Sequence, residues 1–134
     1  MSRMLFLNLP VADLDKSVAF FTSLGFEFNP DFTDENATAM VVNDQAIVML
    51  LVRDFFSTFT DKSIADTASS VEVLCSVSAD SREDVDDIIG KAIAAGGRET
   101  RPKDDRGFMY SGAFEDLDGH IWEVNWMDPA AMQG

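Results

Sequence analysis

Cysteine and histidine are almost absent from this sequence, which has one of each among its 134 residues. The single cysteine, Cys75, excludes an internal disulfide and a zinc cluster built from several thiolates. No apolar run approaches the ~20 residues that cross a bilayer. The first residues, Met-Ser-Arg-Met, also lack the pattern of a secretion signal. We therefore expect a cytoplasmic protein that does not associate with membranes.

Basic residues are also scarce, because ten lysines and arginines stand against 24 aspartates and glutamates, for a formal net charge of -14. This charge repels phosphate backbones, so we do not expect nucleic acid as a partner. It favours solubility, and it also suits a cationic ligand. With 46 % hydrophobic residues, the chain is apolar enough to fold as one domain, residues 1–134.

The first half of the chain alternates apolar segments with turn residues. Asp13 is placed to cap the start of a helix, and Gly25 is placed to end it. Apolar side chains recur between them at helical spacing. Asn43 and Asp44 form a turn between two apolar runs, which predicts a hairpin. The predicted strands, within a first module of residues 4–53, span residues 4–9, 26–28, 37–42 and 46–52.

The second half repeats this order after a short helical connector, residues 54–70. Ser81, with Asp84 three residues later, predicts the start of its helix, and Gly96-Gly97 predicts the end. Because the modules match element for element, duplication explains them, with Val11 corresponding to Val77. The second module, residues 71–127, has predicted strands at 71–77, 98–101, 108–114 and 120–126 and a charged loop at 103–107. The module is followed by a tail, residues 128–134, which is predicted to be frayed.

Two segments of the sequence resemble the signatures of a known superfamily. Leu9-Pro10-Val11-Ala12-Asp13-Leu14-Asp15-Lys16-Ser17, followed by Phe20-Phe21 and Leu24-Gly25-Phe26, resembles the opening signature of the vicinal oxygen chelate (VOC) superfamily. The segment Phe114-Glu115-Asp116-Leu117-Asp118-Gly119-His120-Ile121-Trp122-Glu123 resembles its closing signature. The superfamily includes glyoxalase I, bleomycin-resistance proteins and extradiol dioxygenases, and the whole chain is most similar to bacterial predicted lactoylglutathione lyases.

The resemblance implies an α+β fold. Two βαβββ modules would form a curved mixed sheet around a cup, and the protein would generally be a homodimer. In metal-dependent relatives, ligands lie on the inward face of the first and last strands of each module. Counting from Val11 and Val77, these positions fall on residues Phe6, Met49, Glu72 and Glu123. Because two of them are apolar, we expect either no cofactor or a divalent metal ion held weakly by the two glutamates.

Glu72 and Glu123 are also the candidate catalytic residues. Two close carboxylates in a dry cup do not both ionise easily, so one of them could carry a proton to or from a carbon beside a carbonyl. Such chemistry suits a lyase or isomerase acting on a small oxygenated molecule. The residues expected to bind the substrate are Phe6, Asn8, Met49, Leu51 and Asn125.

A protein without catalytic activity is the alternative. It would sequester a drug or another small molecule, as bleomycin-resistance proteins do, and the apolar side chains at ligand positions favour this possibility. Phe56 and Phe59 in the connector are expected to pack in the core or a dimer interface. Arg101 begins a charged segment that is either solvated or meets an anionic ligand. An extradiol dioxygenase is excluded, because its iron needs two histidines.

Overall fold

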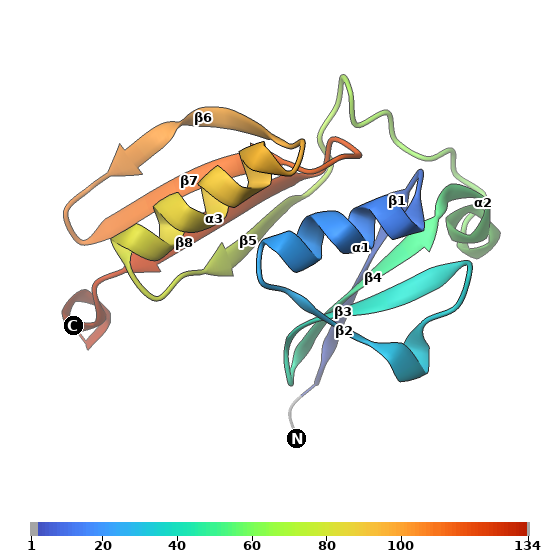
Figure 1. Ribbon diagram of the computed structural model, residues 1–134, viewed down its shortest axis with the longest axis horizontal. Helices are drawn as coiled ribbons and strands as arrows, with labels where there is room; N and C mark the ends of the chain where they lie inside the picture. Colours follow the sequence, from blue (N-terminus) through green and yellow to red (C-terminus); the bar gives the residue numbers. More distant parts are fainter. Residues whose placement is uncertain (1–2, 134) are drawn as a thin grey trace. The chain divides into compact units, whose positions relative to one another are not determined.

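The computed structural model describes residues 3–133. The chain forms two compact units that divide between Ala65 and Asp66, inside the expected connector. Each unit is a four-stranded mixed sheet with one long helix, in the order strand, helix, strand, strand, strand (Figure 1). The predicted α+β class and the repeated module are therefore confirmed.

The first unit begins with a strand that pairs in parallel with the last strand of the same unit. Its sheet has the order β1-β4-β3-β2. Asp13 caps α1 as predicted, since its carboxylate accepts a hydrogen bond of 3.0 Å from the Lys16 backbone N–H. The elements are β1 (Leu5–Val11), α1 (Leu14–Ser23), β2 (Glu27–Asn29), η1 (Pro30–Phe32), β3 (Ala37–Asn43), β4 (Ala46–Val52), α2 (Arg53–Phe56) and η2 (Ser57–Phe59).

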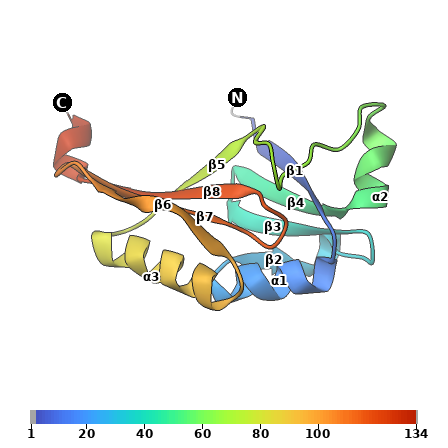
Figure 2. The same ribbon diagram turned by 90° about the horizontal axis from the view of Figure 1, so that it is seen from above.

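The core of the first unit lies between its sheet and α1. Alternate residues of a strand point to opposite faces. Leu9 and Leu50 are paired neighbours on the helix side, where they are buried. Figure 2 shows α1 along this face and α2 on the other side, near one end of the strands. Most of the second face is therefore left without a helix in this unit, and we call it the open face of the first sheet.

The second unit repeats the arrangement, with strand order β5-β8-β7-β6. Its helix starts as predicted, because the Ser81 hydroxyl accepts a hydrogen bond of 3.0 Å from the Asp84 backbone N–H. The Asp84 carboxylate in turn accepts from the Asp80 backbone N–H, at 2.9 Å. The elements are β5 (Leu74–Ser78), α3 (Arg82–Ala94), β6 (Arg98–Asp105), β7 (Met109–Glu115), β8 (Ile121–Met127) and η3 (Pro129–Gln133).

Helix α3 covers one face of the second sheet (Figures 1 and 2). Ile89 from the helix and Trp122 and Val124 from β8 are buried between the two layers. Gly112 on β7 permits this close approach, because a Cβ built there would lie 3.1 Å from the Ile89 Cγ1 atom. The opposite side of the strands, which α3 leaves uncovered, is the open face of the second sheet.

One edge of the second sheet is shorter than predicted. β5 begins at Leu74, which pairs with Ile121 at the start of β8. The strand expected from Val71 is therefore wrong by three residues, because no β8 backbone extends far enough to pair with the residues before Leu74. Glu72 consequently precedes the strand and is exposed.

The other edge is longer than predicted. β6 continues past Arg101 to Asp105 and includes most of the expected charged loop. An edge strand leaves one row of backbone groups unpaired, so it tolerates Pro102 and a series of charged side chains. In the segment expected to be a frayed tail, a short 3-10 turn, η3, reaches Gln133. None of the helices within residues 3–133 is long and apolar enough to cross a membrane.

Candidate functional site

Four of the predicted ligand-binding residues share the open face of the first sheet. Asn8 lies opposite Met49 in the parallel pairing of β1 with β4. Phe6 and Leu51 lie two residues away on the same two strands, so alternation turns them to the same side. Phe6 is 56 % exposed and Leu51 is 4 % exposed. The predicted grouping of these residues therefore agrees with the strand register.

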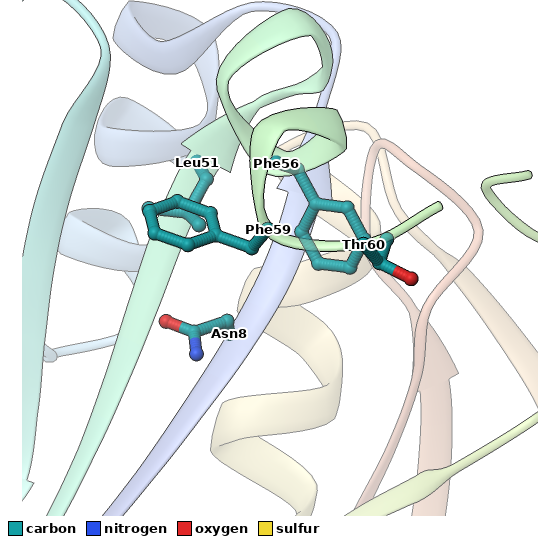
Figure 3. A pocket seen from close by; sticks show the side chains of 5 residues that line it. All are labelled: Asn8, Leu51, Phe56, Phe59 and Thr60. Atoms are coloured by element: carbon teal, nitrogen blue, oxygen red, sulfur yellow. The ribbon is translucent and has the colours of Figure 1, made fainter. Parts of the chain in front are cut away.

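A pocket of about 280 Å³ lies on this face, near α2. Figure 3 shows the Phe56 and Phe59 rings projecting from the α2–η2 segment toward the strands that carry Asn8 and Leu51. Thr60 completes the lining. Phe6 and Met49 share the sheet face but do not line this pocket.

The sequence predicts that Phe56 and Phe59 pack in the core or a dimer interface. Phe59 does contact Phe55 edge to face, with ring centroids 5.1 Å apart, yet it remains 69 % exposed. It therefore presents most of its ring to the surface rather than to the core. Alternating hydrophobicity identifies sheet faces, but it does not show where a connector folds back over them, so it could not find Phe56, Phe59 and Thr60.

The remaining predicted residues with strand positions lie on the open face of the second sheet. Glu123 pairs with Ser76, and Asn125 pairs with Ser78 on the parallel neighbour β5. On the other side, Asn125 lies opposite Ser111 of β7. The Asn125 side-chain amide donates to the Ser76 hydroxyl. This face is thus a row of hydroxyl, amide and carboxylate groups.

Arg101 is the cation on this row. Its Nη2 atom lies 3.7 Å from Glu123 Oε2 and 3.4 Å from the Ser111 hydroxyl. The arginine side chain is 35 % exposed and the glutamate side chain 28 % exposed, so water screens the pair only in part. Arg101 thus places a positive charge beside the Glu123 carboxylate.

Two irregularities in β6 place Arg101 on the open face. The register with β7 shifts between Glu99 and Arg101, and again between Arg101 and Asp104. A bulge adds a residue to one strand and turns the following side chain to the opposite face. In a regular strand Thr100, rather than Arg101, would lie opposite Ala113. A single sequence does not reveal such bulges, although Pro102 between them is a typical sign.

The helix caps correct the predicted correspondence between the modules. Phe6 lies seven residues before the N-cap Asp13. In the second module, the residue seven positions before the N-cap Ser81 is Leu74. Leu74 is therefore the counterpart of Phe6, and the predicted Glu72 is two residues too early. The error came from matching Val11 with Val77 by their similar surroundings in the sequence.

The strand registers give the same correction. Asn8 lies opposite Met49, and its counterpart Ser76 lies opposite Glu123. Glu123 is thus the counterpart of Met49, as predicted. Glu72 has no position in the strand pairing, so the register does not bring the two glutamates onto one sheet face.

The corrected set does not fit a divalent cation. The side chains of Phe6, Met49 and Leu74 contain no oxygen atom, and Glu123 supplies the single carboxylate of the four positions. Hard cations such as Mg²⁺ and Ca²⁺ are held by several oxygen atoms. Within the described residues, no three side chains of histidine, cysteine, aspartate or glutamate lie together as a metal site would require. No metal-dependent step follows from these donors.

A buried polar cluster lies at the turn before β8. Asp116 is 6 % exposed and accepts hydrogen bonds from the backbone N–H groups of Asp118 and His120 and from Trp122 Nε1, at 2.9 to 3.0 Å. Burial raises the pKa of the Asp116 carboxyl, against the opposing effects of His120 and these donors. Burial, with the charge of Asp116, raises the pKa of the Cys75 thiol to about 11. These contacts organise the turn.

Comparisons with known proteins agree with the fold. Residues 3–43 match a family described as bleomycin resistance protein-like N-terminal. The chain is 29 % identical to hypothetical protein SA1046 from S. aureus, over 94 % of this chain and 95 % of that one, with a TM-score of 0.79. No curated protein sequence matches the chain significantly.

Two further solved structures share the fold at lower identity. A glyoxalase/bleomycin resistance protein/dioxygenase family enzyme from Burkholderia phytofirmans PsJN is 16 % identical, with a TM-score of 0.77, over 94 % of this chain and 99 % of that one. Lactoylglutathione lyase from Agrobacterium tumefaciens is 18 % identical, with a TM-score of 0.68, over 94 % of each chain. The chain therefore has the fold of these glyoxalase and bleomycin-resistance proteins, with repeated βαβββ modules, and residues 3–43 of its first module match a bleomycin resistance protein-like family.

Proposed function

We propose that this protein binds a small, partly apolar molecule in the pocket on the open face of the first sheet, without a catalytic metal. The observation that supports this function is the lining itself, in which three apolar side chains meet two polar ones. Ligand sites typically combine apolar walls with a few groups that fix orientation. The match of residues 3–43 to a bleomycin resistance protein-like family also favours binding over catalysis.

The pocket lining suggests the chemistry of the ligand. Phe56 and Phe59 favour a ring or a cation next to a ring, because aromatic faces attract both. The Asn8 amide and the Thr60 hydroxyl suit a hydroxyl or carbonyl group. Residues 1–65 carry nine acidic and four basic side chains, so the field around the unit favours a positive ligand over a negative one. A volume of about 280 Å³ suits a molecule with a single ring.

Three single-ring probes test this function: benzylamine, benzyl alcohol and benzoate, titrated into the isotope-labelled protein and followed by amide NMR shifts. We expect saturable shifts around Asn8 and Thr60, with benzylamine binding most tightly and benzoate most weakly. Phe59→Ala should weaken benzylamine binding about fivefold, which is roughly 1 kcal/mol for a partly covered ring.

Phe32→Ala is the matched control, because Phe32 is 66 % exposed in the same unit but lies outside the pocket. It should leave benzylamine binding unchanged. Equal losses in the Phe59 and Phe32 variants, or an absence of saturable shifts with all three probes, would contradict the proposed pocket.

Acid–base catalysis by Glu123 is a second candidate function. It is favoured by the place of this carboxylate on the open face, next to a guanidinium that could stabilise a developing oxyanion. A suitable probe is hydroxyacetone in D₂O, whose exchange of carbon-bound hydrogen is measured by NMR. Exchange accelerated by the wild type and not by Glu123→Gln would support a lyase or isomerase, and exchange at the buffer rate with both proteins would refute it. The homodimer stays a prediction, which sedimentation tests. The catalytic role of Glu72 also stays a prediction, which the same hydrogen-exchange assay on Glu72→Gln tests.

A further inference from the structure

Arg101 differs from the other arginines of the second unit that form ion pairs across strands or helices. Arg82 and Arg98 approach their carboxylate partners to 2.7 and 2.9 Å. These distances are typical of charge-assisted hydrogen bonds. Arg101 Nη2 stays 3.7 Å from Glu123 and 3.4 Å from the Ser111 hydroxyl. The guanidinium therefore lies between two groups without closing fully on either one.

The backbone of β6 is built to hold this side chain on the open face. Two register shifts flank Arg101 within one eight-residue strand. Bulges interrupt the hydrogen-bond ladder and are frequent beside functional sites, where they redirect a side chain. Here they turn a cation toward the Glu123 carboxylate and away from α3.

The duplication shows that this polar row is a local specialisation. The strand registers make Met49 the counterpart of Glu123, and Leu51 the counterpart of Asn125. The same backbone positions are thus apolar on the open face of the first sheet and polar on the second. The fold itself does not require polar residues there, so their presence in the second unit calls for another explanation.

We propose that Arg101 and Glu123 form a subsite for a small ligand that carries an oxyanion and, on the adjacent atom, a hydroxyl or ammonium group. The oxyanion would accept from the guanidinium and from the Ser111 hydroxyl, and the adjacent donor would bind the glutamate. The 3.7 Å between Nη2 and Oε2 suits two such groups on neighbouring carbons, each forming a hydrogen bond of about 2.8 Å. None of the residues of this subsite lines the aromatic pocket, so each proposal can be tested without the other.

The strongly negative net charge of the chain makes a cation at this position significant. A protein with a formal charge of -14 repels small anions in general, so an anionic ligand needs a dedicated cation at its site. A planar guanidinium matches the two oxygen atoms of a carboxylate, which lysine does not. Ser111, which is 3 % exposed, offers a hydroxyl at a fixed position beside it.

The experiment uses glycolate, glycine and acetate as probes, in amide NMR titrations of the full chain at constant ionic strength. Glycolate and glycine carry the adjacent donor, and acetate does not. We expect saturable shifts at Ser111 and Asn125 with the first two probes and at least fivefold weaker binding of acetate. Arg101→Gln should weaken glycolate binding at least tenfold, and Arg101→Lys should have an intermediate effect. Glu123→Gln should reduce the preference for glycolate over acetate.

Arg98→Gln is the matched control, because Arg98 lies on the same strand and pairs with Glu115 at 2.9 Å. It should bind glycolate as the wild type does, and the spectra themselves report whether each variant is folded. Equal losses in the Arg98 and Arg101 variants, or no saturable shift with glycolate or glycine, would overturn the subsite. Because the pocket is followed through Asn8 and Thr60 with benzylamine, failure of one proposal is distinguishable from failure of the other.

Discussion

Replacement of Asp116 by asparagine should destabilise the second unit, although the two side chains have nearly the same size. One carboxylate oxygen accepts from two backbone N–H groups, and the other accepts from Trp122 Nε1 at 3.0 Å. An amide has one acceptor oxygen and one NH₂ group. If its oxygen serves the backbone donors, its NH₂ must face the indole N–H. The hydrogen bond to Trp122, which is 1 % exposed, is then replaced by a contact between two donors.

The cost is that of leaving a buried donor without this acceptor, about 1 to 3 kcal/mol. For a protein of this size, that corresponds to a fall in Tm of roughly 3 to 10 °C. Urea unfolding followed by tryptophan fluorescence measures it directly, because Trp122 and Trp126 both belong to the second unit. Asp87→Asn is the control with the same charge change. It should cost under about 0.5 kcal/mol, since Asp87 forms an exposed ion pair with Lys91.

The pH dependence gives a second test of the same carboxyl group. Because burial raises the pKa of Asp116 in the folded protein, the folded state holds this proton more tightly than the unfolded state. The contribution of Asp116 to stability therefore falls as pH rises from the ordinary carboxyl pKa through the raised one. The stability of the wild type minus that of Asp116→Asn should decrease over this window. An increase would mean that the three donors outweigh burial, and equal stability of the two proteins at all pH values would refute the assigned hydrogen bonds.

Two further predictions concern the packing and the thiol of the second unit. Gly112→Ala should cost about 1 to 3 kcal/mol, because the new Cβ would lie 3.0 Å from Lys103 Cδ and 3.1 Å from Ile89 Cγ1. Gly90→Ala on α3 is the control, because a Cβ built at Gly90 has no atom within 4 Å. This change should stabilise the protein by about 0.5 to 1 kcal/mol, because alanine favours a helix more than glycine does. Urea unfolding measures both variants, and equal changes in their stability would contradict the packing at Gly112. Because the pKa of the Cys75 thiol is about 11, Cys75 should react with iodoacetamide at pH 8 at least ~100-fold more slowly than in the unfolded chain. Mass spectrometry measures the two rates. Comparable rates in the folded and unfolded chain would refute the burial of Cys75.

The sequence predicted the elements of the fold where local chemistry determines them. Asp13 and Ser81 cap helices because their side chains bond to the backbone a few residues away, and such signals survive in a single sequence. The edges of the second sheet were predicted less well. The start of β5 depends on where its partner β8 begins, and the end of β6 depends on its place at the edge, where charged residues are tolerated.

The candidate site was predicted where strand alternation is sufficient. Asn8 and Leu51 share a face because side chains alternate along paired strands, and Asn125 shares a face with Glu123 for the same reason. Glu72 was predicted as the counterpart of Phe6 by a count along the sequence. The helix caps show that the counterpart is Leu74, two residues later, and this offset is not visible in the sequence count. The position of Arg101 was missed because it depends on bulges between strands, which are a property of the pairing rather than of either strand alone.

The open faces also bear on how such a protein acquires new ligands. Met49 and Glu123 occupy the same place in the two copies, on faces that α1 and α3 do not cover, so exchanging one residue type for the other leaves each helix-covered core intact. Selection can therefore alter recognition in one copy while the other copy keeps its own, with little loss of foldability. In this chain, the residues that keep each module folded lie on a different face of the sheet from those proposed to bind a ligand.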